Sequence, residues 1–462
     1  MLIREAQIGG LIRDVRVVGD RIAAIEPRLA PEPGEPVIEA AGGALLPGLH
    51  DHHIHLNAAA AALGSVRCGP PDVSDARGLA KALSAVAGAG WLRGVGYHPS
   101  VAGEIDRDWL DRHGPQRPVR VQHRGGRMWI VNSLAARLLG SGVPPDGRLI
   151  DRDDWLRGRL GAAPPDLAAM GATLARLGVT GVTEVTPRNS LADYHRYAEA
   201  GLPQRLLVMG DATLDAAAPI ARARRGAVKL HYHDHDLPAL DSLAAEVGCA
   251  HDAGRAVASH CVTLAELMLT LAAVETVGAH AGDRIEHGGV ITPEAADWIA
   301  GLGLTVVSQP HFLTERGAAY LADVPASDLH WLYRLRGLAE AGILIAAGSD
   351  APFGGVDPWA SMAAAVDRPP GFGSEAGLTP EAALALYIGE AEAPGTPRRV
   401  AVGAVADLCL IDRDWSTARR ALATVEVRAA IVGGEPVYLS MESTRPQARA
   451  SSAGTRRIDS AR

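Results

Sequence analysis

Side chains that bind metals lie at the ends of several apolar runs. In PGLHDHHIHL, alternation places His53 and His55 on one face of a strand. His260 ends RAVASH, His287 ends RIEH and Asp350 ends ILIAAGSD. A single histidine pair is equally well explained by hydrogen bonding in a core, but imidazoles and a carboxylate from several strand ends are the ligands of zinc and similar divalent cations. We therefore expect these side chains to form a metal centre.

Lysine is nearly absent from the chain. Lys81 and Lys229 are the only lysines among 45 basic residues, and Lys229 lies in AVKLHY, in the strand preceding the one that ends at His260. A neutral amine can react with carbon dioxide to give a carbamate that bridges two metal ions, whereas a guanidinium stays protonated. Lys229 is therefore a candidate bridge. The alternative is a lysine that points into the barrel and pairs with an acid.

Eight apolar runs predict an α/β fold, a TIM-type (β/α)8 barrel over residues 47–395. The runs are ALLPGLHDHHIHL, GVTGVTEV, RLLVMG, AVKLHY, RAVASHC, RIEHG, LTVVSQP and ILIAAGSD. Ala- and Leu-rich helical segments separate most of them, as expected of βα units. Active sites of such barrels lie at the carboxyl ends of the strands, where these histidines and Asp350 fall.

Three further segments complete the expected organisation. The long gap between the first and second strands predicts an inserted cap over residues 57–165, because loops after barrel strands cover the active face. Short strand-like runs within residues 1–46 and 396–440 predict a small β-sandwich built from both chain ends. Residues 441–462 are polar and small, which predicts a disordered tail.

These motifs together resemble the amidohydrolase superfamily, and in particular its family 3, which contains N-substituted formamide deformylases. PGLHDHHIHL, KLHYHDHD, ASHCVTLAEL, IEHGGVITPE and GSDAPFGG carry the resemblance, which spans residues 1 to about 440. It implies the following metal ligands: His53, His55, Lys229, His260, His287 and Asp350. It also implies that Asp350 carries the proton, that Lys229 is carboxylated and binds a second ion, and that the metal is zinc. Iron, manganese and nickel remain open.

Other polar residues near these motifs have less specific roles. His231 and His233 share the face of Lys229 if its strand continues, and we assign them to the surroundings of the metal. His50 and His52 fall on the opposite face from His53, where packing is the simpler explanation.

Candidate substrate contacts come from the seventh strand and from the cap. His311 ends LTVVSQPH, at the barrel mouth. The cap segment HRGGRMWIVNS contains Arg124, Arg127, Trp129 and Asn132, a mixture able to hold an anionic or planar group, although an ordinary cap core explains Trp129 equally well. Relatives often have a histidine near Arg127, so the identity of the substrate does not transfer.

The leading hypothesis is a hydrolase that cleaves a non-peptide carbon–nitrogen bond in an amide, formamide or cyclic amide by metal-activated hydroxide, with Asp350 as the proton shuttle. The same site could act on an ester, lactone or phosphoester, because a Lewis acid does not select the leaving group. A barrel that has lost catalysis and serves as a scaffold is a third hypothesis. Missing ligands would be its hallmark, and the principal ligands are all present.

Composition limits the classes of molecule that this protein is expected to bind and the compartment in which it is expected to work. With 45 Lys and Arg against 53 Asp and Glu, the net charge is −8, which argues against nucleic acid as a partner. The absence of a long apolar run or leader predicts no membrane association and a cytoplasmic location. Four cysteines without a CxxC pair indicate reduced thiols. We expect a small-molecule substrate, and a homodimer is an open alternative.

Overall fold

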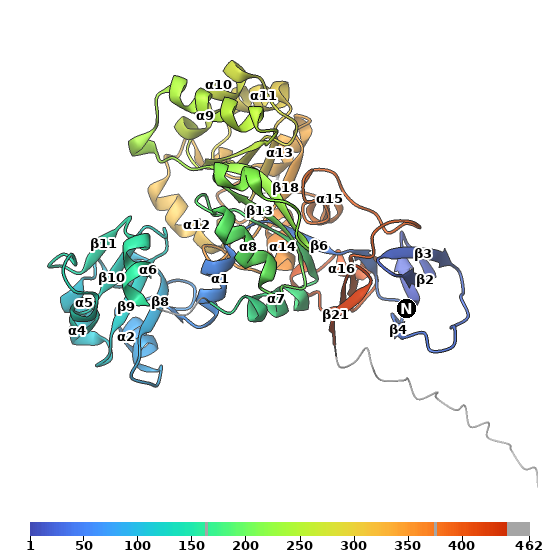
Figure 1. The fold of residues 1–462 in the computed structure, drawn as a ribbon, viewed down its shortest axis with the longest axis horizontal. Coiled ribbons are helices and arrows are strands. Elements are labelled where there is room, and N and C mark those ends of the chain that lie inside the picture. Colours follow the sequence, from blue (N-terminus) through green and yellow to red (C-terminus); the bar gives the residue numbers. More distant parts are fainter. Residues whose placement is uncertain (162–164, 374–376, 441–462) are drawn as a thin grey trace, which may run out of the picture.

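The computed structural model describes residues 1–161, 165–373 and 377–440. At its centre, parallel strands form one sheet in the order β18-β17-β16-β15-β14-β13-β12-β6, with helices around it (Figure 1). The strands are β6 (Leu49–Ile54), β12 (Val179–Glu184), β13 (Arg205–Gly210), β14 (Ala223–Leu230), β15 (Val257–Cys261), β16 (Arg284–His287), β17 (Thr305–Ser308) and β18 (Ile345–Ala347). Each coincides with one predicted run, which confirms the TIM-type barrel. The predicted tail, residues 441–462, lies outside the described residues, as do residues 162–164 of the predicted cap.

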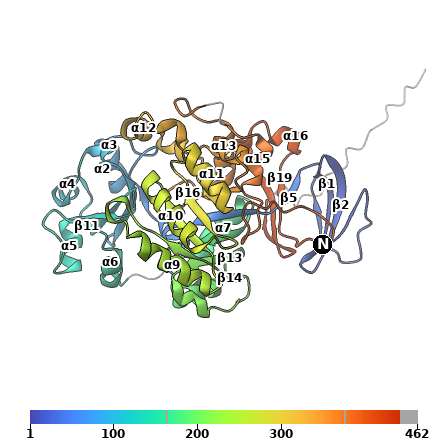
Figure 2. The same cartoon turned by 90° about the horizontal axis from the view of Figure 1, so that it is seen from above.

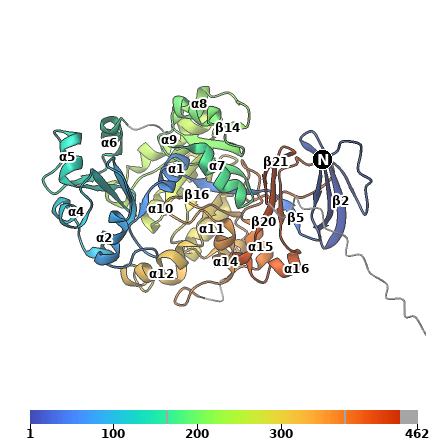
Figure 3. The ribbon, with the colours of Figure 1, turned by 90° about the horizontal axis from the view of Figure 1, so that it is seen from below.

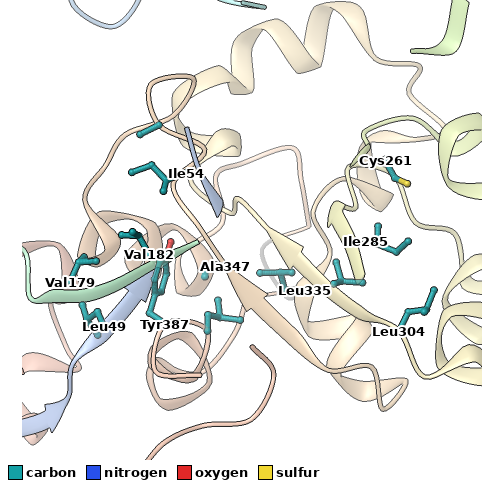
Figure 4. Close-up of a cluster of buried hydrophobic side chains, with 14 of the residues drawn as sticks. Leu49, Ile54, Val179, Val182, Cys261, Ile285, Leu304, Leu335, Ala347 and Tyr387 are labelled. Atoms are coloured by element: carbon teal, nitrogen blue, oxygen red, sulfur yellow. The ribbon is translucent and has the colours of Figure 1, made fainter. Parts of the chain in front are cut away.

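The barrel strands are buried on both faces. Every residue of β6 and β12 is buried, as expected of a parallel sheet covered by helices outside and filled by side chains inside. Leu49, Val182, Ile285 and Leu304 belong to the largest apolar cluster, which lies between strands and helices (Figure 4). The apolar residues of each strand therefore hold its ends at fixed positions around the mouth.

Local signals determine where the surrounding helices begin. Capping boxes start α8 at Ser190 and α10 at Thr263, and proline follows the capping residue of α11, α14 and α15. The helices are α1 (Leu56–Leu63), α7 (Leu167–Arg176), α8 (Leu191–Glu199), α9 (Leu240–Asp252), α10 (Leu264–Val277), α11 (Pro293–Leu302), α12 (Phe312–Asp323), α13 (Leu335–Glu340), α14 (Pro358–Val366), α15 (Pro380–Ala385) and α16 (Trp415–Ala418). Across the described ranges, none has both the length and the apolar character needed to cross a membrane.

The segment between β6 and β12 forms a sheet of its own, in the order β11-β10-β9-β8-β7. Its strands are β7 (Val66–Arg67), β8 (Leu92–Tyr97), β9 (Val119–His123), β10 (Met128–Val131) and β11 (Arg148–Ile150). Its helices are α2 (Ala76–Ser84), α3 (Pro99–Ala102), α4 (Arg107–His113), α5 (Ser133–Leu139) and α6 (Asp153–Leu160). This cap lies at one end of the molecule, beyond α1 and α12 (Figures 1 and 2).

Both chain ends build a pair of four-stranded sheets at the opposite end (Figure 3). One sheet contains β1 (Leu2–Ile8), β2 (Leu11–Val18), β3 (Arg21–Glu26) and β4 (Val37–Glu39). The other contains β5 (Leu45–Pro47), β19 (Leu408–Ile411), β20 (Val427–Val432) and β21 (Glu435–Leu439). Ile3 and Val15 of the first share one core with Leu408 and Ile431 of the second. The sandwich built from both chain ends is thus observed, and the exact domain boundaries stay predictions.

The barrel closes where β18 meets β6. The backbone nitrogen of Asp350 donates to the carbonyl oxygen of His53 at 2.7 Å, and that of His55 donates to Ala351 at 3.0 Å. The Asp51 carboxylate also accepts a hydrogen bond from the Ser349 backbone nitrogen at 2.9 Å. Barrel closure and the meeting of the predicted metal ligands are therefore one event.

Gly348 allows this closure. A Cβ atom there would lie 2.3 Å from the His53 backbone nitrogen and 2.5 Å from its Cβ. We expect Gly348→Ala to lower the free energy of unfolding by about 1–3 kcal/mol, the usual cost of overpacking, and to lower metal content by displacing His53. Denaturant midpoints and elemental analysis measure the two effects.

A matched control is Gly301→Ala in α11, where a Cβ has no neighbour within 4 Å. Because alanine is the better helix former, this variant should be as stable as the wild type or more so. Equal midpoints for Gly348→Ala and wild type would contradict the close contact.

Candidate metal centre

Three of the predicted ligands meet at the mouth of the barrel. His53 lies near the end of β6, His55 follows directly after this strand, and Asp350 follows β18. Asp350 Oδ1 lies 3.4 Å from His53 Nε2 and 3.3 Å from His55 Nε2. One ligand atom from each of the three residues lies within 4.8 Å of the others. His53 and Asp350 are buried, while His55 is partly open to solvent. The structure thus brings a His-His-carboxylate set together where metal and water can enter.

The remaining predicted ligands extend this set around the barrel. The His287 ring centroid lies 4.7 Å from that of His53, and the His260 ring lies 4.5 Å from that of His287. Lys229 is the penultimate residue of the neighbouring strand β14 and pairs in register with Ala258 of β15. Lys229, His260 and His287 therefore lie at or near the ends of three adjacent strands, β14, β15 and β16.

The backbone is strained at two of these residues. His287 has φ of 70° and Asp350 has φ of 51°, a region that side chains other than glycine rarely adopt. Such conformations persist where surrounding structure enforces them, and they concentrate at functional sites. Here they turn the two side chains at the ends of β16 and β18.

Unpartnered polar atoms test whether this group suits a cation. His53 Nε2, Asp350 Oδ1 and Lys229 Nζ are buried and have no hydrogen-bond partner among the described residues. Buried polar atoms without partners are unfavourable, and most have one. A divalent cation would satisfy the nitrogen and the oxygen, and conversion of the amine to a carbamate would supply further oxygen ligands. The donor set therefore fits a divalent metal.

Hydrogen bonds orient three of the histidines in the same way. The Nδ1 atom of His53 bonds to Glu286, that of His55 to Thr186 at 3.1 Å, and that of His287 to Gln309 at 2.8 Å. Each contact leaves Nε2 available, which is how a partner behind a metal-ligating histidine fixes its tautomer and ring orientation.

Glu286 belongs to a buried ionic chain beneath the centre. Its Oε1 lies 2.5 Å from Arg284 Nε, and Arg284 Nη2 donates to the carbonyl of His52 at 2.9 Å. Burial raises the pKa of Glu286, but the positive charges of Arg284 and Lys229 outweigh it and hold this pKa far below its usual range. The ionised carboxylate then accepts a hydrogen bond from His53 Nδ1.

Burial also sets the protonation of the other groups. It lowers the pKa of His287 to about 3 and that of Lys229 to about 8, and it lowers the pKa of His260 well below its usual range. For Asp350, burial raises the pKa, but the nearby imidazoles of His53, His55 and His287 hold it well below its ordinary value. Neutral imidazoles, an ionised carboxylate and an easily deprotonated amine are the forms that bind metal.

Sequence reasoning missed Glu286, Gln309 and Arg284. The detectable signal was an acid and a base two residues apart, Arg284 and Glu286, inside the short apolar run RIEH. Two charges on one face of an otherwise apolar, fully buried strand require partners within the barrel. For Gln309, the sequence carries no comparable signal.

The predicted substrate contacts lie in different places. His311 is buried, with Nδ1 bonded to Ser361 at 2.9 Å and Nε2 to the carbonyl of Ser349 at 3.1 Å, so neither nitrogen is free. Trp129 is buried in a cap core, and its indole nitrogen donates to Asp153 at 2.8 Å. Both side chains are therefore engaged in contacts within the protein, and their role in substrate binding stays a prediction.

Arg127 lies in the cap, His231 and His233 lie beside His260, and His50 and His52 are buried in β6. Arg127 Nε donates to Asp151 at 2.7 Å, which pairs it within the cap. The His231 ring lies 4.2 Å from that of His260 and 4.6 Å from that of His233, beside the predicted ligands. His50 and His52 are buried and stacked on each other at 4.4 Å, with His50 bonded to Thr183.

A barrel with histidines, a lysine and an aspartate converging at its strand ends is the architecture of a metal-dependent hydrolase. A sequence profile of the amidohydrolase family matches residues 36–438. The chain therefore belongs to the amidohydrolase family, and it is a hydrolase of carbon–nitrogen bonds other than peptide bonds.

Individual relatives agree with this assignment. The chain is 25% identical to N-substituted formamide deformylase of Arthrobacter pascens, over 87% of this chain and 90% of the relative. It is similar in fold to an uncharacterized metal-dependent hydrolase from Pyrococcus furiosus, with a TM-score of 0.71 and 20% identity, covering 89% of this chain and 99% of the other. It also resembles the zinc complex of atrazine chlorohydrolase TrzN from Arthrobacter aurescens, with a TM-score of 0.58 and 14% identity, covering 95% of each chain.

The buried ionic chain predicts a severe effect of Glu286→Gln. The substitution leaves the guanidinium of Arg284, which is 3% exposed, without its counter-ion. Loss of one partner of a buried ion pair costs about 3–5 kcal/mol, and a weakened partner behind a ligating histidine lowers metal affinity about 10- to 100-fold. Denaturant midpoints of the chelator-treated protein and competition with a chromophoric chelator measure these changes.

Glu381→Gln provides the control, because Glu381 pairs with Arg419 on the surface at 2.7 Å. That change should cost less than about 1 kcal/mol and leave metal affinity unaltered. If the two variants behaved alike, the ionic chain would have no special role.

Proposed function

We propose that this protein hydrolyses the carbon–nitrogen bond of a small amide, formamide or cyclic amide, with zinc as its divalent metal. The proposed metal ligands are His53, His55, Lys229, His260, His287 and Asp350. Carboxylation of Lys229 makes the centre binuclear. The observation that carries the proposal is the position of Asp350 Oδ1, buried and 3.3–3.4 Å from the Nε2 atoms of two histidines.

A divalent cation held there supplies Lewis acidity, which makes a water molecule more acidic and polarises a carbonyl group. Asp350 is ionised and lies where the water and the substrate nitrogen must meet. Its carboxylate takes the proton of the water and returns it to the leaving nitrogen. Glu286, Thr186 and Gln309 hold three imidazoles in the required orientation, so that little rearrangement accompanies the reaction.

The similarity to the formamide deformylase supports an amide-type bond, and the zinc complex of TrzN supports zinc as the metal. We propose a cytoplasmic location, because the four cysteines are free thiols and three of them are buried, as is usual for proteins of reducing compartments.

Asp350→Asn tests the assignment of the reaction. Wild-type protein should contain zinc and release amine from N-formyl, N-acyl or cyclic amide substrates. It should not release alcohol from the matched esters. The variant removes a proton carrier, and general acid–base groups contribute about 10²–10⁴-fold. We expect kcat to fall by at least that range, while KM changes less. Zinc-free wild-type protein that hydrolyses only esters would overturn the proposal.

Lys229→Ala tests the second ion. The variant should lose about half of the metal, and its activity should fall by more than about 100-fold. This loss is larger than the one usually seen when a residue that only hydrogen-bonds a metal ligand is replaced. Added propionate should restore part of the activity by replacing the carbamate. The other lysine, Lys81, is exposed, and Lys81→Ala should change nothing. Full metal content in Lys229→Ala would exclude the bridge.

A further inference from the structure

Two arginines approach the loop that follows Asp350, one from the barrel and one from the cap. Arg316 belongs to α12; its Nη2 donates to the carbonyl of Phe353, and its guanidinium lies 3.7 Å from the Phe312 ring centroid. Arg124 lies in the turn between β9 and β10 of the cap. Figures 1 and 2 both show α12 beside the cap.

Phe353 connects both arginines to the metal centre. Its ring centroid lies 5.4 Å from that of His55. On its other side lies Gly126 of the cap turn, where a Cβ would be only 2.7 Å from the Phe353 Cε1 atom. The turn that carries Arg124 therefore rests directly on a residue that contacts a proposed metal ligand.

The positive charge of these two arginines is not neutralised by ion pairs. Among the described residues, no carboxylate forms a salt bridge with Arg124 or Arg316, and the side chain of Arg124 has no hydrogen bond. The nearest acids are otherwise placed: Asp323 acts on Arg124 only at a distance, and Glu315 accepts the backbone nitrogen of Gly355 at 2.9 Å.

The neighbouring histidines are not further cations beside these two arginines. His98 and His123 lie beside the turn with ring centroids 6.2 Å apart, and burial lowers the pKa of each, so both are neutral at pH 7. Burial and the charge of Arg316 also lower the pKa of Arg124, which means that the two cations disfavour each other. These two guanidinium groups have no acid to pair with and lie next to the proposed metal centre. An anion bound between them would offset their mutual repulsion and accept charged hydrogen bonds.

We propose that Arg124 and Arg316 bind a carboxylate of the substrate while its amide group lies at the metal centre. The inference rests on the proposed function and narrows its substrates to amides that carry an acid group, such as N-formyl or N-acyl amino acids. Guanidinium forks match a carboxylate in geometry and charge. Arg316 is held by Phe312 and Phe353, and Arg124 contributes from the cap, so the pair also ties cap position to substrate binding.

Formate release from N-formylleucine and from its methyl ester tests this assignment with the zinc-loaded enzyme. The wild type should prefer the acid, and added salt should weaken that preference because it screens the attraction. In Arg124→Gln, kcat/KM for the acid should fall about 10- to 100-fold, mainly through KM, as expected when a charged hydrogen bond is lost. For the ester it should fall much less. Arg124→Lys should keep part of the preference.

Arg137→Gln is the matched control, because Arg137 is exposed on α5 at the far side of the cap; it should retain the wild-type preference. Calorimetric binding of isocaproate, an acid without a carbon–nitrogen bond, gives a readout independent of turnover and should weaken in Arg124→Gln. The inference would be overturned if the enzyme hydrolysed formamides with no preference for the acid and if Arg124→Gln left isocaproate binding unchanged. The proposed function would still stand in that case. Isocaproate binding that depends on Arg124, without any amide hydrolysis, would support the anion site and refute the function.

Discussion

The contact between Glu286 and His53 is the interaction on which the rest of the site depends. A carboxylate with no exposed surface is tolerated inside the barrel only because Arg284 and His53 share its charge. Arg284 is in turn held by the carbonyl of His52. The chain of contacts thus runs from β16 to β6 and fixes the imidazole of His53 through its Nδ1 atom. It gives the barrel no stability that apolar packing could not supply, but it defines the orientation of His53, which apolar packing cannot do.

Closure of the barrel adds a second constraint at the same point. The hydrogen bonds of Asp350 and His55 to the opposite strand leave no room for a side chain at Gly348. The left-handed backbone at Asp350 lies within this arrangement, and His287 adopts the same backbone region at the end of β16. Because strain of this kind is held by the surrounding fold, the ligand geometry is fixed before any cation binds.

The sequence predicted the strands well because they follow from short-range regularities, and the same regularities located the residues that we propose as ligands. Alternation in PGLHDHHIHL and the recurrence of a polar residue at the end of each apolar run locate the mouth of a parallel barrel. The partners behind the ligands could not be found in this way, since Gln309 meets His287 only when β16 and β17 are aligned side by side. The contacts of His311 with Ser349 and of Trp129 with Asp153 could not be found from the sequence for the same reason, because they arise from tertiary packing.

The division of labour between barrel and cap explains why motifs for the metal are recognisable while the substrate is not. Every proposed ligand comes from a barrel strand end, where register and closure restrict variation. By contrast, Arg124 and Gly126 belong to a turn of the inserted cap, which reaches the centre through Phe353. Such a turn can change its side chains without disturbing β6, β16 or β18. Substrate choice can therefore change in the cap while the reaction chemistry is preserved, and the segment HRGGR carries the arginine that we propose to bind the substrate carboxylate.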